Sequence, residues 1–176
     1  MFNRILVPTD FSAPSDAALE YARAVAMRFG ASLQLLHVVE DPYRAAYPSE
    51  VYVPEVEGLR DDLLADGVAR LRDCLQSSDI RALGATTAAV IGTPSGSIVE
   101  YAKTHHIDLI VMGTHGRGGV SHLLMGSVAE RVVRTAPCPV LTVRETPTLA
   151  RAKTTSEAAV EVPPVLMATS GVDGQC

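Results

Sequence analysis

Three glycines and a serine with a distinctive spacing follow an apolar run in the second half of the chain. Gly113 and Gly116 are followed, after nine further residues, by Gly126 and Ser127. Glycine can adopt positive φ and lets backbone amides approach a ligand closely, and the amides at the start of a helix favour an anion. The spacing therefore predicts a cradle for a phosphate chain, although it is neither the GxxxxGK[ST] loop nor the dinucleotide fingerprint.

Turn formation is the alternative use of the same residues. Glycines commonly mark turns, and Ser127 with Glu130 three residues later has the pattern of a helix capping box. Residue types alone leave phosphate binding and turn formation equally open. Within the same segment, the permanent cation of Arg117 suits phosphate better than His115 does, and either could instead be a solvated loop residue.

The histidines and cysteines do not form a metal-binding or disulfide pattern. His105, His106 and His122 match no standard zinc spacing, and the three cysteines are widely separated. We expect surface histidines and reduced thiols. Cys138 lies between two prolines and is predicted to pack as a small apolar residue.

Expected strands and helices alternate along the chain, and they must position the glycine-rich segment. Short apolar runs alternate with amphipathic stretches, which is the pattern of βαβ units and predicts an open α/β fold with helices on both faces of a parallel sheet. In such sheets, ligands bind outside the carboxyl ends of the strands, and Gly113 begins at such an end. The expected strands are 4–8, 33–39, 87–91, 108–112 and 139–143.

Four main helices are expected between these strands. The first ends before Gly30, a residue suited to a helix C-cap, and the third begins with Thr93-Pro94 and ends near His105. The last helix spans 127–136. Residues 40–55, with three prolines and three tyrosines, are predicted to be a surface loop. The apolar positions that mark inward faces are Ala18, Ala22, Val25 and Phe29 in the first helix, Leu64, Val68, Leu71 and Leu75 in the second, and Ile98, Val99 and Ala102 in the third.

Length and composition restrict the classes of function. The 176 residues, 47% of them hydrophobic, suffice for one domain, while a net charge of −5 without a basic cluster argues against direct binding of nucleic acid. No secretory signal is recognised and no apolar run is long enough to cross a bilayer, so we expect a cytoplasmic protein. Residues 144–176 are predicted to be a mostly disordered tail.

The motifs together resemble those of the universal stress protein family. The spacing Gly-x2-Gly-x9-Gly-Ser in its context closely resembles the ATP-binding motif of that family. The opening Ile5-Leu-Val-Pro-Thr-Asp10 and the closing Pro137-Cys-Pro-Val-Leu-Thr-Val143 resemble the family as well. The resemblance covers residues 1–143 as a whole domain and leaves the tail outside.

The resemblance implies a Rossmann-like five-stranded parallel sheet with the order 3-2-1-4-5 and ATP at the carboxyl ends of strands one and four. It implies that the carboxylate of Asp10 accepts hydrogen bonds from ribose hydroxyls, and that Val38 contacts adenine. Each assignment has an alternative, because Asp10 could only stabilise its turn and Val38 could only belong to the core. The implied ATP-binding residues are Pro8, Thr9, Asp10, Val38, Met112, Gly113, His115, Gly116, Arg117, Gly126, Ser127 and Val128.

The function implied by the resemblance is that of an ATP-binding regulatory module in a stress response. Mg²⁺ can accompany ATP through phosphate oxygens and water, with few protein ligands. Homodimerisation through Val140–Val143 and an unidentified protein partner are expected. The alternatives are a slow ATP hydrolase or adenylyl-transferring relative, and a nucleotide-free dimeric interaction protein. The lack of a P-loop lysine favours at most slow hydrolysis.

Overall fold

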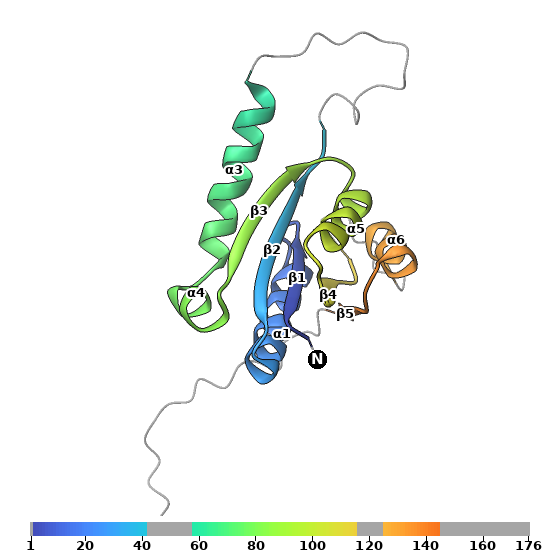
Figure 1. Ribbon diagram of the computed structural model, residues 1–176. Coiled ribbons are helices and arrows are strands. Elements are labelled where there is room, and N and C mark those ends of the chain that lie inside the picture. The colour runs from blue at the N-terminus through green and yellow to red at the C-terminus, as the bar shows by residue number, and fades with distance from the viewer. Residues whose placement is uncertain (1, 42–57, 116–124, 145–176) are drawn as a thin grey trace, which may run out of the picture. The chain divides into compact units, whose positions relative to one another are not determined.

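A single parallel sheet organises the described part of the chain. The computed structural model describes residues 2–41, 58–115 and 125–144. Five strands lie in the order β3-β2-β1-β4-β5, which confirms the expected topology (Figure 1). They are β1 Arg4–Thr9, β2 Ser32–Val39, β3 Thr86–Ile91, β4 Leu109–Gly113 and β5 Val140–Val143.

Five helices are present among the described residues, one more than the sequence predicted. The additional helix is α4, which follows α3 almost directly and ends at Gly84 with φ of 54°. Its seven residues are too few to show a helical period in the sequence. The helices are α1 Ala13–Phe29, α3 Leu59–Cys74, α4 Ser77–Leu83, α5 Pro94–Thr104 and α6 Ser127–Thr135.

The helices form two layers, one on each face of the sheet. Successive strand residues point to opposite faces, so Ile5 and Val7 pack in one cluster with α1, α3 and α4, while Leu6 packs in the other with α5 and α6 (Figure 1). All three side chains are fully buried. The near-continuous apolar runs of the sequence are thus explained by burial on both faces.

The expected inward faces are only partly confirmed. Ile98, Val99 and Ala102 of α5 are buried, as are Ala18 and Ala22 of α1. By contrast, Phe29 is 43% exposed and its ring meets that of Phe2 edge to face, with centroids 5.4 Å apart. In α3, only Gly67 and Leu71 are buried, and the predicted stripe at Leu64, Val68 and Leu75 is half-buried.

A buried ion pair fastens the corner between α3 and α4 to α1. The guanidinium of Arg23 donates to both carboxylate oxygens of Asp79, with a shortest distance of 2.8 Å, and to the carbonyl oxygen of Cys74. Burial by itself would raise the pKa of Asp79, but the hydrogen bonds from Arg23 and from the Gln76 amide outweigh it and lower that pKa. The α3–α4 corner therefore depends on the charged form of Asp79.

A carboxylate also joins two strands at their amino ends. One Asp108 oxygen accepts hydrogen bonds from the backbone amides of Asn3 (2.8 Å) and Arg4 (2.9 Å). The bond from Asn3 is the largest cause of a lowered Asp108 pKa, and the bond from Arg4 adds to it against the opposing effect of burial. Asp108 therefore tethers the start of β1 to the start of β4.

The remaining sequence expectations concern the cysteine, membrane and loop assignments. Cys138 packs half-buried against the cluster under α5 and α6, as predicted, and burial raises the pKa of its thiol. No helix in the described ranges is long and apolar enough to cross a membrane. The predicted surface loop lies largely, and the predicted tail almost entirely, outside the described residues.

Candidate functional site

A cavity of about 690 Å³ lies at the carboxyl ends of β1, β2 and β4. Its size is within the range of pockets that bind small molecules. Ten of the twelve residues predicted to bind ATP line it, and the other two, Gly116 and Arg117, lie outside the described residues. The ten are Pro8, Thr9, Asp10, Val38, Met112, Gly113, His115, Gly126, Ser127 and Val128.

The turn after β1 is held by its own side chains. One oxygen of Asp10 accepts hydrogen bonds from the backbone amide and the hydroxyl of Ser12, while the amide of Phe11 donates to Thr9 Oγ1 over 3.0 Å. Asp10 thus stabilises its turn, as the alternative interpretation proposed, and it also borders the cavity. The two roles are compatible because a carboxylate can accept about four hydrogen bonds.

Gly113 is required by packing rather than by an unusual backbone angle. The expectation of a positive φ is wrong for this residue, because the positive-φ glycines in the described chain are Gly30, Gly58 and Gly84. A Cβ at Gly113 would lie 2.9 Å from the backbone of Pro14. The glycine therefore lets the first turn of α1 lie against the end of β4, which brings the turn that carries Asp10 close to that strand.

The start of α6 completes the glycine-rich side. Gly126 is the N-cap residue and its amide donates to the carbonyl oxygen of Thr114 over 2.7 Å. Ser127 is the first helical residue, so the predicted capping box of Ser127 and Glu130 is not formed, and no side chain within the described ranges caps the helix. The first turn of α6 therefore borders the cavity with its backbone amides, an arrangement that favours anions. We call Met112, Gly113, His115, Gly126, Ser127 and Val128 the α6 wall.

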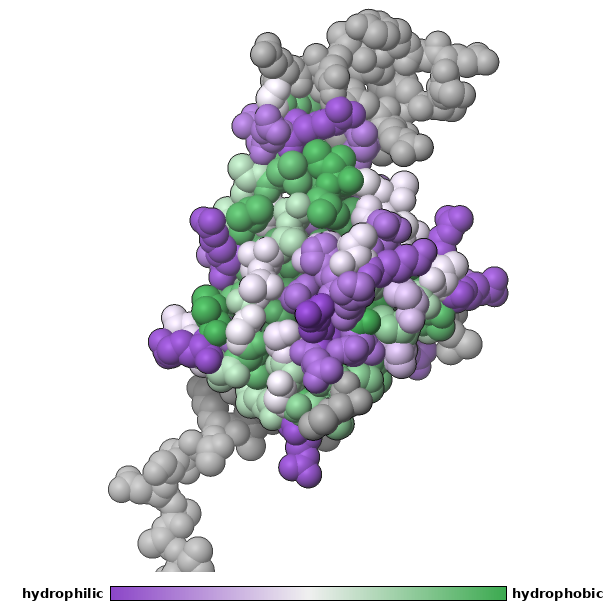
Figure 2. Space-filling model, in the orientation of Figure 1, coloured by the Kyte–Doolittle hydropathy of each residue, from purple (hydrophilic) through white to green (hydrophobic). Residues whose placement is uncertain are grey.

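Apolar side chains form the floor of the cavity between β2 and α5. Val38 is half-buried there beside Leu36 and Ile98. Figure 2 shows apolar side chains gathered over the carboxyl-terminal parts of β2 and β3. Such a surface suits the face of a planar base. Ile98 was expected only as a core residue, because its helical spacing gives no sign that it borders a ligand site.

The opposite side of the cavity was missed by the sequence reasoning. His37 Nδ1 donates to the carbonyl oxygen of Thr9 over 2.8 Å, and its ring lies 4.5 Å from that of Phe11. The guanidinium of Arg70 lies over the Phe11 ring as well, 3.9 Å from the ring centroid. We call this side the α3 wall; it is lined by His37, Glu40, Leu63, Asp66 and Arg70.

The charges of the described lining are unevenly distributed. Asp10, Glu40 and Asp66 supply carboxylates, whereas Arg70 is the one arginine or lysine among the lining residues of the described ranges. No group of three or more histidine, cysteine or acidic side chains in those ranges is placed to hold a metal ion. The arrangement offers a carboxylate for hydroxyl groups, an apolar face for a base, and backbone amides with one arginine for an anion.

Comparisons with known proteins identify the family and the fold of the chain. The sequence profile of the universal stress protein family matches residues 1–144. Universal stress protein MJ0531 of Methanocaldococcus jannaschii is 34% identical over 145 residues, covering 82% of this chain and 84% of its own. The solved structure of universal stress protein UspA from Lactobacillus plantarum matches with a TM-score of 0.67 and 33% identity, covering 81% of this chain and 98% of the other.

A second solved structure contains a bound ligand. It is a universal stress protein in complex with cAMP, which matches with a TM-score of 0.59 and 25% identity and covers 82% of this chain and 99% of the other. The residues matched by the family profile, 1–144, include both walls of the cavity.

Proposed function

Because this chain belongs to the universal stress protein family, we propose that it is an ATP-binding regulatory module that responds to nucleotide in stress. The observation that carries the proposal is the meeting of Asp10, the apolar floor and the first turn of α6 around one cavity. These three features correspond to the ribose, the base and the phosphates of one ligand. The cAMP complex of a relative supports an adenine nucleotide.

ATP uses the amide-rich side of the cavity most fully. A triphosphate carries more negative charge than a monophosphate, and the start of α6 offers backbone amides beside the hydroxyl of Ser127. Mg²⁺ would bind through phosphate oxygens and water, because that ion needs few protein ligands. The acidic residues of the lining then lie near a ligand whose charge is partly neutralised.

Regulation rather than metabolism fits the chemistry of the lining. Efficient phosphoryl transfer depends on charges positioned around the transferred group, and the described lining offers one arginine and no lysine. We therefore propose that hydrolysis is far slower than the roughly 1 to 1,000 s⁻¹ of typical enzymes. Rapid multiple-turnover phosphate release that is lost in a site variant would contradict this.

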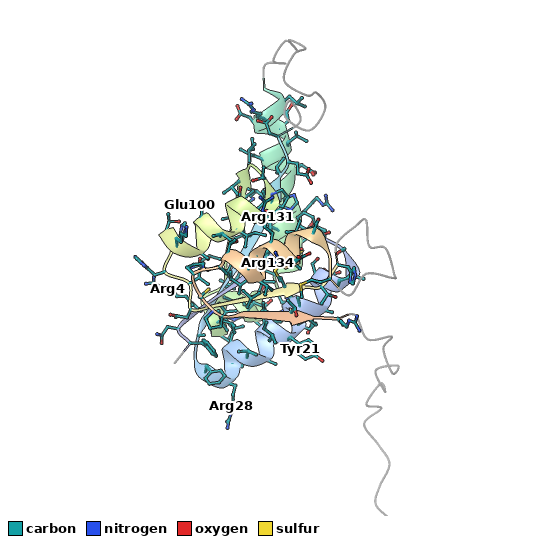
Figure 3. All side chains as sticks on the ribbon, turned by 90° about the vertical axis from the view of Figure 1, so that its right-hand side faces the viewer. Arg4, Tyr21, Arg28, Glu100, Arg131 and Arg134 are labelled. Atoms are coloured by element: carbon teal, nitrogen blue, oxygen red, sulfur yellow. The ribbon has the colours of Figure 1, made fainter. Side chains whose placement is uncertain are left out.

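The edge of the sheet supports the proposed homodimer. Leu141 of the edge strand β5 is 38% exposed, and Val133 of α6 and Tyr21 of α1 are exposed as well. Figure 3 shows Tyr21 on one side of β5 and Arg131 and Arg134 on the other. An open apolar strand edge favours pairing with a second copy. Leu141→Lys should shift the protein to a monomer in analytical ultracentrifugation, whereas Arg28→Glu, remote from β5, should leave a dimer.

Calorimetry on the full chain tests nucleotide binding. Asp10→Asn keeps an oxygen that can accept from Ser12, so the turn is retained while the carboxylate offered to ribose is lost. We expect ATP affinity to fall about tenfold. Asp16→Asn, an exposed change of equal charge in the first turn of α1, is the control. Unchanged ATP binding by a folded Asp10→Asn, or no adenine nucleotide bound by the parent protein, would show that the proposed site is wrong.

A further inference from the structure

Arg70 is a half-buried cation that borders the cavity. Among the described residues its guanidinium forms no ion pair, although Asp66 lies one helical turn earlier and borders the same cavity. The guanidinium instead contacts the face of the Phe11 ring, 3.9 Å from the centroid. A guanidinium stacked on a ring keeps the N–H groups at its edge available for hydrogen bonds.

Phe11 is held in place as a platform for this cation. Its φ of 64° is uncommon for a residue with a side chain, and such angles persist where surrounding contacts enforce them. The Phe11 amide donates to Thr9 Oγ1, and the ring packs beside His37, which is itself bonded to the Thr9 carbonyl oxygen. The orientation of Arg70 is therefore largely set before a ligand arrives.

Charge indicates which part of a ligand Arg70 meets. The described lining contains three carboxylates, at Asp10, Glu40 and Asp66, and an anionic ligand entering beside them needs a cation. We infer that Arg70 donates hydrogen bonds to phosphate oxygens of the bound nucleotide. Because α3 and α6 lie on opposite faces of the sheet, the phosphates are then held from two sides, by the guanidinium and by the amides of α6. The inference rests on the nucleotide binding proposed above.

Calorimetric titration of the full chain with ATP and with adenosine tests the phosphate contact. Arg70→Gln removes the cation but keeps a planar polar group, and we expect it to weaken ATP binding at least about tenfold while adenosine binding changes less than about twofold. Arg72→Gln makes the same charge change at an exposed position of α3 and should leave both affinities within about twofold of the parent. Thermal melting establishes that each variant is folded.

Two further variants separate charge from stacking. Arg70→Lys keeps the charge but loses the planar fork, so its ATP affinity should lie between those of the parent and Arg70→Gln. Phe11→Leu keeps an apolar side chain but removes the aromatic face, and it should weaken ATP binding more than adenosine binding.

Distinct outcomes would overturn the inference. An equal loss of ATP and adenosine affinity in Arg70→Gln would mean that Arg70 only shapes the cavity. ATP binding as tight as that of the parent would mean that it does not contact the ligand. If the parent binds ATP, either outcome removes this inference alone, whereas a parent that binds neither ATP nor adenosine removes the proposed function together with it.

Discussion

The α6 wall and the α3 wall border the same cavity but arise in different ways. The α6 wall comes from one stretch of chain, in which Gly113, Gly126 and Ser127 have a spacing that is recognisable in the sequence alone. The α3 wall joins the end of β2 to the middle of a helix, where His37 and Arg70 have no shared pattern. A local motif can thus identify half of a site, while the other half depends on how distant elements pack.

The two walls also differ in what holds them. Backbone bonds fix the α6 wall, including the 2.7 Å bond from the Gly126 amide to the Thr114 carbonyl oxygen. Side chains fix the α3 wall, through the ion pair of Arg23 with Asp79 and the contact of Gly67 with His37, where an added Cβ would lie 3.1 Å from the imidazole ring. Substitutions should therefore affect the two walls differently.

The largest expected effect is a loss of stability when the ion pair of Arg23 with Asp79, which holds the α3–α4 corner to α1, is broken. Asp79→Ala leaves Arg23 without its buried charge partner and should lower the free energy of unfolding by about 3 kcal/mol, measured by urea denaturation. Glu20→Gln removes the outer partner of Arg23, whose carboxylate is 72% exposed, and should cost less than about 1 kcal/mol. Equal losses from the two variants would show that the buried pair does not anchor the corner.

The next effect is on ligand binding, at the α6 wall. A side chain at Gly126 would begin 3.2 Å from the Thr114 carbonyl oxygen, so Gly126→Val should move the start of α6 as well as obstruct the phosphates. We expect ATP affinity to fall at least tenfold, which is about 1.4 kcal/mol, with a stability loss of about 1 to 3 kcal/mol.

The measurement for Gly126→Val must separate these two effects. Calorimetry well below the melting temperature reports the affinity of folded protein, and denaturation reports its stability. A decrease in binding that only follows the unfolded fraction would mean that Gly126 is a turn residue without a role toward phosphate.

Acid should lower the stability of the protein by protonating two carboxylates. Asp108 holds the start of β1, and Asp79 holds the α3–α4 corner. The pKa values of Asp108 and Asp79 are lowered in the folded protein, so their contribution to stability is present above the pKa of the unfolded chain, near 3.9, and is lost as pH falls through the folded-state values. We expect stability to decrease below about pH 4. Asp108→Asn should reduce the slope of stability against pH in that range, and an unchanged slope would contradict the assignment.

The smallest effect is expected from removing residues 145–176. The last strand of the sheet ends at Val143, and the family match ends at residue 144. A chain ending at residue 144 should keep the stability of the parent to within about 0.5 kcal/mol and should bind ATP equally well. A clear loss of stability would show that the removed segment contributes to the folded domain.

Sequence patterns predicted most of the fold and the residues that border one side of the cavity. The apolar runs predicted all five strands to within about one residue, because burial on both faces leaves a continuous apolar signal. The order of the strands followed from family resemblance. The short helix α4 was missed, because seven residues show no clear period. The start of α6 at Ser127 was predicted, but the alternative capping box of Ser127 and Glu130 is not formed, because Gly126 is the N-cap residue.

The sequence by itself determined which residue types stand at the ends of the strands, and therefore the turn with Asp10 and the glycine-rich α6 wall. These features are local, since each depends on neighbours within a few positions along the chain. Only the tertiary structure showed three contacts. Gly113 lets the first turn of α1 pack against β4, the Phe11 ring lies under the guanidinium of Arg70, and residues of α3 line one side of the cavity. Such contacts join residues that are tens of positions apart, and side-chain packing between separate elements leaves no periodic trace in the sequence.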